Sequence, residues 1–99
     1  MLYMVRRTTL DGKVLFRKAG LMDSSSVWNK NGKCWTSKGA FKSFLGYVMN
    51  SSGRRTSGGA ENVIHNYPED TFEILEIDTT NGCINTSDFL DWCAENDML

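Results

Sequence analysis

The stretch that decides the fold is residues 2–18, LYMVRRTTLDGKVLFRK, where two runs of strand-favouring residues flank Asp11-Gly12. An Asp-Gly pair suits the positive φ angles of a two-residue hairpin turn, so this segment predicts two antiparallel strands. A two-residue loop sets Arg6 opposite Arg17 on one face of the hairpin. The other face then carries Val5, Arg7, Thr9, Val14, Phe16 and Lys18. Like charges opposed across a ladder are unfavourable, so we expect the arginine pair to face solvent, an anion or a carboxylate.

A second strand signal lies in residues 72–78, FEILEID, which are rich in β-branched and aromatic residues. Apolar side chains point to both faces of this segment, which is typical of a strand in the interior of a sheet. The segment carries three carboxylates, whereas the N-terminal hairpin carries three arginines. Placing the two side by side in one sheet therefore puts opposite charges across from each other.

Two helices complete the expected fold. Ser37 is placed to cap a helix over residues 37–50, in which Phe41, Phe44, Leu45 and Val48 follow the spacing of a buried stripe. A second helix over residues 87–96 starts at Thr86 or Ser87 and buries Phe89, Leu90 and Cys93, after a turn at Asn81-Gly82. The sequence predicts an α+β fold, a small and mainly antiparallel sheet of three to five strands with two helices packed on it.

Residues 27–35, VWNKNGKCW, predict a second hairpin with Asn31-Gly32 as its turn and Trp28 opposite Trp35. Two interpretations of this tryptophan pair stay open. It either covers the edge of the core or forms an aromatic platform, flanked by Lys30 and Lys33, that stacks on a base or anchors a protein partner.

The remaining chain is less regular. Residues 50–59, NSSGRRTSGG, are polar and glycine-rich, and predict a flexible loop at about 50–60 within one domain spanning residues 1–99. Residues 60–67 fit either a helix or a strand, and Pro68 ends that segment.

Charge is divided sharply along the chain. Residues 1–55 hold all eleven Lys and Arg with two carboxylates, and residues 56–99 hold ten carboxylates with no Lys or Arg, giving local charges of +9 and −10. A partner attracted to one half is repelled by the other.

No catalytic or metal-binding motif accompanies this asymmetry. The three cysteines have no Cys-x-x-Cys spacing and predict free, mostly buried thiols, and the one histidine, His65, supplies neither a catalytic pair nor a ligand set. We therefore expect no enzyme activity, no metal and no cofactor. The N-terminus lacks a signal-peptide core and no apolar run reaches ~18 residues, so we expect a cytoplasmic protein without a membrane span.

The candidate partner-binding residues are basic or aromatic. They are Trp28, Lys30, Lys33, Trp35, Lys38, Lys42, Arg54 and Arg55, with a secondary basic surface of Arg6, Arg7, Arg17 and Lys18. The first expectation is a non-enzymatic binding protein with a protein partner. The alternative is an RNA- or single-strand-binding module, although the pI of 5.7 is low for one. Either a monomer or a homodimer fits the sequence.

Residues 31–45, NGKCWTSKGAFKSFL, resemble a pattern found in small bacteriophage-encoded accessory proteins, in which a Gly-Lys turn and a Trp lead into a Lys-Gly helix ending in Leu. The matching residues are Gly32, Lys33, Trp35, Lys38, Gly39, Lys42 and Leu45. The resemblance covers about one-sixth of the chain, and it implies binding to a host or defence component rather than catalysis. It carries over no active-site residue, and the acidic half matches no family pattern.

Overall fold

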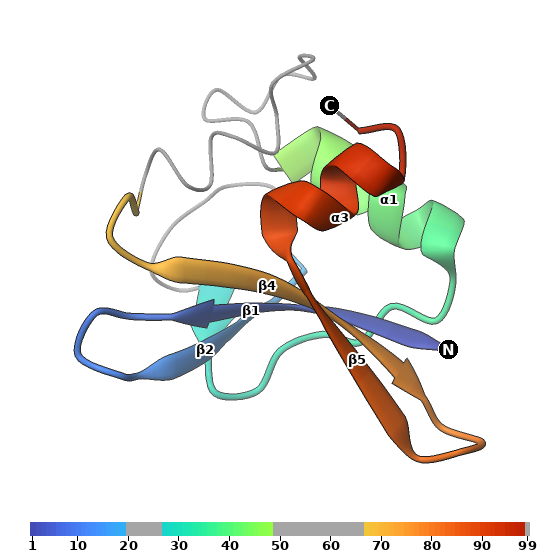
Figure 1. Ribbon diagram of the computed structural model, residues 1–99, viewed down its shortest axis with the longest axis horizontal. Coiled ribbons are helices and arrows are strands. Elements are labelled where there is room, and N and C mark those ends of the chain that lie inside the picture. The colour runs from blue at the N-terminus through green and yellow to red at the C-terminus, as the bar shows by residue number, and fades with distance from the viewer. Residues whose placement is uncertain (20–26, 49–66, 99) are drawn as a thin grey trace.

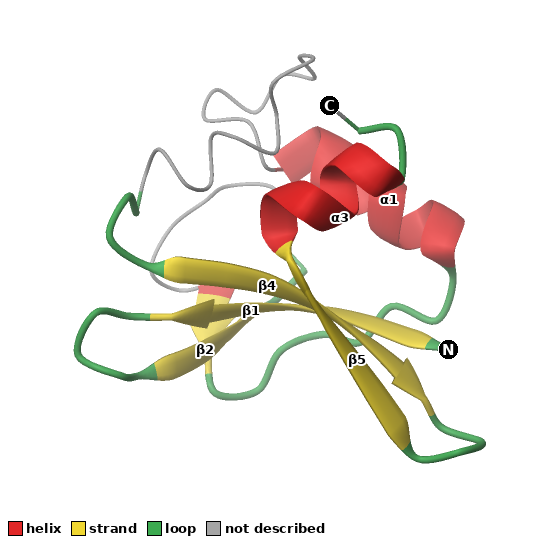
Figure 2. Cartoon of the chain, viewed as in Figure 1, coloured by secondary structure: helices red, strands yellow, loops and turns green. Residues whose placement is uncertain are grey.

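A five-stranded antiparallel sheet with two helices on one face forms the α+β fold that the sequence predicts (Figures 1 and 2). The computed structural model describes residues 1–19, 27–48 and 67–98. The strands lie in the order β3-β2-β1-β4-β5. Their bounds are β1 Leu2–Thr8, β2 Val14–Arg17, β3 Trp28–Asn29, β4 Thr71–Asp78 and β5 Cys83–Asp88, and the helices are α1 Lys38–Val48 and α3 Phe89–Glu95.

The β1–β2 hairpin forms, but its loop is longer than the sequence predicts. The N–H of Thr9 donates to the carbonyl of Lys13 (2.9 Å), and the N–H of Gly12 donates to the carbonyl of Thr9 (2.9 Å). Gly12 has a φ of 90°, a left-handed conformation that glycine adopts without a Cβ clash. The loop therefore has three residues, with a glycine in the left-handed position, rather than two.

This extra loop residue shifts the register by one and turns every β2 side chain to the other face. Arg6 pairs with Phe16 and Arg7 with Leu15. The predicted pairing of Arg6 with Arg17 is wrong, and so is the predicted sharing of a face by Arg7 and Phe16. Arg17 instead points to the face that the helices cover.

Strand β4 confirms the predicted strand over residues 72–78. It pairs with β1 on one side and β5 on the other, as its apolar character on both faces indicates. Arg6 is the direct cross-strand partner of Glu73, so the basic hairpin and the acidic strand do lie side by side.

The predicted hairpin over residues 27–35 does not form. Trp28, in β3, pairs with Arg17 of β2, whereas Trp35 makes an isolated bridge to Tyr3 of β1. The chain between them passes close to β2, because a Cβ built on Gly32 would lie only 2.4 Å from the Cβ of Phe16. Gly32 is thus needed for close approach to β2 and not for a hairpin turn.

Helix α1 confirms the predicted start. The hydroxyl of Ser37 accepts from the N–H of Ala40 (3.2 Å), which satisfies one of the donors that the first helical turn leaves open. Phe41 and Leu45 are fully buried, and Phe44 packs against the core.

The C-terminal segment differs from the prediction in two respects. Residues 83–88 continue as β5, a strand that the sequence reading missed, so α3 starts later than Thr86 or Ser87. Its cap is Asp88, whose carboxylate accepts from the first-turn N–H groups of Leu90 and Asp91 (3.1 and 3.2 Å). The turn before β5 is confirmed, with Gly82 at a φ of 68°. Phe89 and Cys93 are buried as predicted, and Trp92 joins them, whereas Leu90 is half-buried.

The sheet has two unlike faces, which we call the covered face and the open face. The covered face meets α1 and α3, where Tyr3, Val5, Phe72 and Ile74 share a core with helix residues that include Phe41 and Trp92. The ring centroids of Tyr3 and Trp92 lie 5.5 and 5.4 Å from that of Phe41, which makes Phe41 the centre of an aromatic cluster. The open face carries the alternate residues of the same strands, Leu2, Met4, Leu75, Ile77 and Ile84.

The flexible loop expected at about 50–60 and the segment 60–66 lie outside the described residues, as does His65. Neither described helix has the length and apolar character that crossing a membrane requires.

Candidate functional site

The sheet order separates the charges of the chain in space. Strands β1, β2 and β3 belong to the basic half of the sequence and β4 and β5 to the acidic half, so the two halves meet between β1 and β4. At that boundary the guanidinium of Arg6 donates to the carboxylate of Glu73, with Nη2 2.8 Å from Oε1. Both side chains are about 30% exposed, so the ion pair fixes the register of the two strands more than it stabilises the fold.

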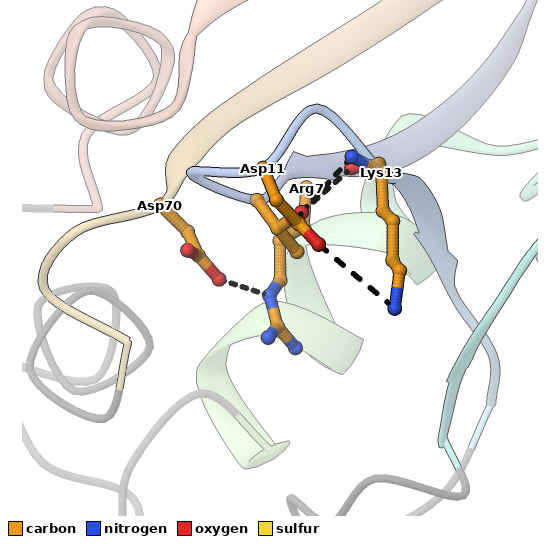
Figure 3. A network of polar contacts seen from close by, with 5 residues as sticks. Arg7, Asp11, Lys13 and Asp70 are labelled. Carbon is orange, nitrogen blue, oxygen red and sulfur yellow. Dashed lines mark hydrogen bonds and ion pairs between the residues drawn. The ribbon is translucent and has the colours of Figure 1, made fainter.

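A second ion pair lies at the same end of this boundary, on the covered face (Figure 3). Nε of Arg7 lies 2.5 Å from Oδ2 of Asp70, just before β4. The guanidinium also lies over the ring of Tyr67, 3.7 Å from its centroid, and 5.5 Å from that of Trp28. These contacts hold Arg7 in place on the covered side, and Arg6 and Arg7 are each paired with a carboxylate of the acidic half.

Arg17, the third arginine of the predicted secondary surface, is completely buried. Its guanidinium carbon lies 5.7 Å from the ring centroid of Trp28 and 5.6 Å from that of Phe44. The one-residue register shift is what places this charge inside the molecule. Arg17 therefore belongs to the interior and does not present a charge to a partner.

Both candidate tryptophans belong to the core, each with an exposed fraction of 5%. Trp28 packs edge-on against Phe72 (5.8 Å between centroids), and Trp35 packs against Phe44 (4.3 Å). Of the two interpretations that the sequence leaves open, the one in which the tryptophans cover the core is confirmed. An aromatic platform on the surface is not what these residues form.

Three exposed lysines gather at the β3 end of the sheet, and we call them the basic edge: Lys18, Lys30 and Lys33. Backbone hydrogen bonds hold their segments together, since the N–H of Lys18 donates to the carbonyl of Val27 (2.7 Å) and that of Lys33 to the carbonyl of Arg17 (3.1 Å). Lys30 directly follows β3. Within residues 1–19, 27–48 and 67–98, none of the three forms an ion pair.

The two lysines of α1 lie apart from the basic edge. Lys38 is exposed in the first turn, and its ammonium lies 5.8 Å from the ring centroid of Trp92 in α3. Lys42 follows one turn later and is half-buried. The predicted site is thus divided between the basic edge, the helix and the core. Arg54 and Arg55 lie outside the described residues.

A second group of exposed charges is acidic and belongs to α3, which packs beside α1 on the covered face (Figure 1). Exposed carboxylates follow α3 and its flanks, at Asp88, Asp91, Glu95 and Asp97. Sequence reasoning ranked Lys18 only in the secondary basic surface, because neither periodicity nor spacing shows that residue 18 lies beside residue 27. The basic edge could have been found from the charge asymmetry together with the β1–β4 pairing. That pairing neutralises arginines of the basic half with carboxylates of the acidic half, and the lysines of the basic edge remain without an ion pair among the described residues.

The cysteines differ from the expectation of mostly buried thiols, because Cys34 and Cys83 are exposed and only Cys93 is buried. Burial first, and then the negative charge of the Asp88 carboxylate, raises the pKa of the Cys93 thiol to about 12. This thiol stays protonated at neutral pH and is a weak nucleophile. Among the described residues no group of three or more His, Cys, Asp or Glu side chains is arranged to hold a metal ion.

No protein-family model matches this chain, and no curated protein or solved structure shows significant similarity to it.

Proposed function

We propose that this protein is a non-enzymatic binding protein and that its basic edge binds an acidic surface of another protein. One observation carries the proposal. Lys18, Lys30 and Lys33 stay exposed and outside every ion pair of the described residues, although two arginines of the same half are neutralised at the β1–β4 boundary. The ammonium of Lys33 lies 5.3 Å from the ring centroid of Trp35, and no carboxylate that the structure describes neutralises its charge. Exposed charges without a paired carboxylate attract a partner of opposite sign.

A protein partner is favoured over a nucleic acid by the position of the aromatic residues. Binding of single strands combines a basic groove with exposed rings on which bases stack. Trp28 and Trp35, the two tryptophans of the predicted site, are 95% buried and packed in the core. The carboxylates of α3 would also repel a phosphate backbone that extends along the molecule.

A modulating role in a host cytoplasm is part of the same proposal. The resemblance of residues 31–45 to phage accessory proteins includes Lys33 of the basic edge and implies binding rather than catalysis. The buried thiol of Cys93, whose pKa is raised to about 12, supports a protein without nucleophilic chemistry at that position.

The proposal is tested by affinity capture from host lysate with two charge-matched variants. The basic-edge variant carries Lys18→Glu, Lys30→Glu and Lys33→Glu. The control variant carries Lys13→Glu, Lys38→Glu and Lys42→Glu, so that both variants change the net charge equally. We expect the wild-type protein and the control to retain a stoichiometric, nuclease-resistant partner, and the basic-edge variant to lose it.

Two results would overturn this proposal. Equal loss of the partner from both variants would mean that net charge, and not the basic edge, drives binding. Loss of all captured material after nuclease treatment would instead favour the nucleic-acid alternative, which purified RNA and single-stranded DNA at low salt would then test directly.

A further inference from the structure

Strand β5 is the last strand of the sheet and presents one edge away from β4. Five of its six residues are exposed, and Ile84 keeps 63% of its surface in contact with solvent. The β4–β5 hairpin reaches away from the helices, and α3 turns back over the covered face toward α1 (Figure 1), where Trp92 packs against Phe41. The outer edge of β5 therefore faces outward along its length.

An outward-facing edge strand offers a row of backbone N–H and C=O groups to any other strand. Natural sheets usually protect such an edge with lysine, proline, a bulge or a very short strand. Residues 83–87, CINTS, contain no charged residue and no proline, and all six residues of β5 pair with β4 in one uninterrupted register. The usual protective devices are missing from this strand.

We infer that the partner of this edge is β5 of a second copy of the chain, paired antiparallel about a two-fold axis to give a homodimer with one continuous ten-stranded sheet. A two-fold axis normal to the sheet keeps the open faces of both copies on the same side. The register that pairs residues 83–87 of the two copies sets Asn85 opposite Asn85 of the second copy and Ile84 opposite Thr86 of the second copy. The two Ile84 side chains then occupy diagonal positions, which lie ~7–8 Å apart and within reach of each other.

Charge favours this occupant over a charged strand of another protein. Because residues 83–87 are neutral, they give no electrostatic preference to a charged partner strand, whereas they meet no like charge when they pair with themselves. The only charged residue of β5 is Asp88, at the end of the strand, where its carboxylate caps α3.

The antiparallel arrangement also separates the acidic ends. Asp88 of one copy lies opposite Gly82 of the other, so the two Asp88 residues are six positions apart along the strands, or roughly 20 Å at ~3.3 Å per residue. That separation exceeds the screening length of ~8 Å at physiological salt, so the two α3 helices repel each other only weakly. A parallel pair would bring them together.

Pairing would also extend the apolar part of the open face. Ile84 lies beside Ile77 of β4, which lies beside Leu2 of β1, so the three form one row across the sheet. In the dimer the end of this row contacts the second copy instead of water, and Ile84, its most exposed member, loses the most solvent-exposed surface. Burial of apolar surface is the main favourable term of association.

The mass of the full chain in solution tests the inference. Sedimentation or light scattering over a range of concentrations should give twice the 11.2 kDa of one chain. The double variant Ile84→Lys/Thr86→Lys sets lysines opposite each other across the pair and should raise the dissociation constant of the dimer by about tenfold or more. Val14→Lys is the control for a lysine added elsewhere on the open face, since Val14 is 47% exposed but lies in β2, separated from β5 by β1 and β4, and it should leave the dimer intact.

Cross-linking tests the register without depending on stability. In a Cys34→Ser/Cys83→Ser background, Asn85→Cys places two thiols opposite each other and should give a covalent dimer on mild oxidation. Val14→Cys in the same background should stay monomeric on a non-reducing gel.

A wild-type mass of one chain at all concentrations would overturn the inference, and so would cross-linking of Val14→Cys as fast as Asn85→Cys. Loss of the dimer in Ile84→Lys/Thr86→Lys counts as support when circular dichroism shows a native fold. If that variant is unfolded, the cross-linking result decides. The dimer inference is independent of the proposal for the basic edge. A dimer that binds no acidic partner would overturn only the proposed function, and a monomer that binds one would overturn only the dimer.

Discussion

Replacement of Gly32 by alanine should destabilise the protein, because the added Cβ atom would clash with β2. The added Cβ would lie 2.4 Å from the Cβ of Phe16, 3.1 Å from the carbonyl oxygen of Arg17 and 3.3 Å from the carbonyl carbon of Phe16, and Cβ contacts below 3.0 Å essentially never occur. All three atoms are part of, or directly attached to, the β2 backbone, so no side-chain rotation relieves the clash. Overpacking of this kind costs about 1–3 kcal/mol, or ~4–8 °C in Tm per kcal/mol for a chain of this size.

A second glycine provides the control. A Cβ on Gly39, in the first turn of α1, would meet only the Ser37 hydroxyl oxygen at 3.7 Å, an ordinary contact. Gly39→Ala should therefore raise stability by a few tenths to about 1 kcal/mol through helix propensity. Urea unfolding followed by circular dichroism gives both values.

A double-mutant cycle isolates the cause. Phe16→Gly removes the clashing Cβ, so Gly32→Ala should cost at least about 1 kcal/mol less in that background than in the wild type. Phe16→Ala keeps the Cβ and should not relieve the clash. Equal costs of Gly32→Ala in the wild-type and Phe16→Gly backgrounds would refute the reasoning and indicate that backbone freedom at Gly32, not close approach, makes glycine necessary.

Three further predictions concern single side chains. Asp88→Ala should cost about 1 kcal/mol in urea unfolding because it removes the cap of α3, whereas Asp88→Asn should keep most of that stability. The pKa of Asp78 is lowered, first by a hydrogen bond from the Asn81 side chain and then by backbone N–H groups, so its stabilising effect is present above the ordinary carboxyl pKa and is lost as the pH falls through the lowered value. Asn81→Ala should move that pKa upward in an NMR titration, and an unchanged titration curve would contradict the assignment. Ellman's reagent should label two thiols in the native protein, and Cys93 only on unfolding, because burial raises its pKa to about 12.

The elements of the fold that could be predicted from sequence are those whose signal is local. The buried stripe of Phe41 and Leu45 and the cap at Ser37 belong to one helix, so nearby residues are enough to predict them. The structure confirms both. The strand over residues 72–78 is likewise set by its own composition. The pairing of that strand with the basic hairpin follows from charge alone, and Arg6 and Glu73 meet as expected.

The features that could not be predicted depend on small energy differences between similar local structures. An Asp-Gly pair fits a two-residue loop and also a three-residue loop ending in a left-handed glycine, and that single residue decides whether Arg17 faces solvent or the core. The strand over residues 83–88 was missed because its polar residues lack the alternating pattern of a half-buried strand, since β5 lies mostly exposed at the edge.

The candidate site shows the same division between local and long-range information. The sequence identifies Trp28 and Trp35 as neighbours of lysines. Only the tertiary fold shows that Trp28 pairs with Arg17, that Trp35 pairs with Tyr3, and that both are buried. A tryptophan in a basic segment fits a stacking platform and a core residue equally well, because both uses require the same large ring. Burial, which the pattern of two tryptophans does not encode, separates them.

The two proposals predict opposite responses to salt, and this separates them in one series of measurements. The basic edge attracts an acidic partner through exposed lysines, so that affinity should fall as the salt concentration rises and the attraction is screened. In the dimer through β5 the acidic Asp88 ends of the two copies lie roughly 20 Å apart and repel each other at low salt, and the dimer is held by backbone pairing and apolar contact around Ile84. Screening removes the repulsion and leaves those contacts, so dimerisation should become tighter between ~10 mM and ~150 mM salt, where the screening length shortens from ~30 Å to ~8 Å. A dimer that weakens with salt would mean that opposite charges hold the copies together, which the two-fold pairing of two β5 strands does not provide.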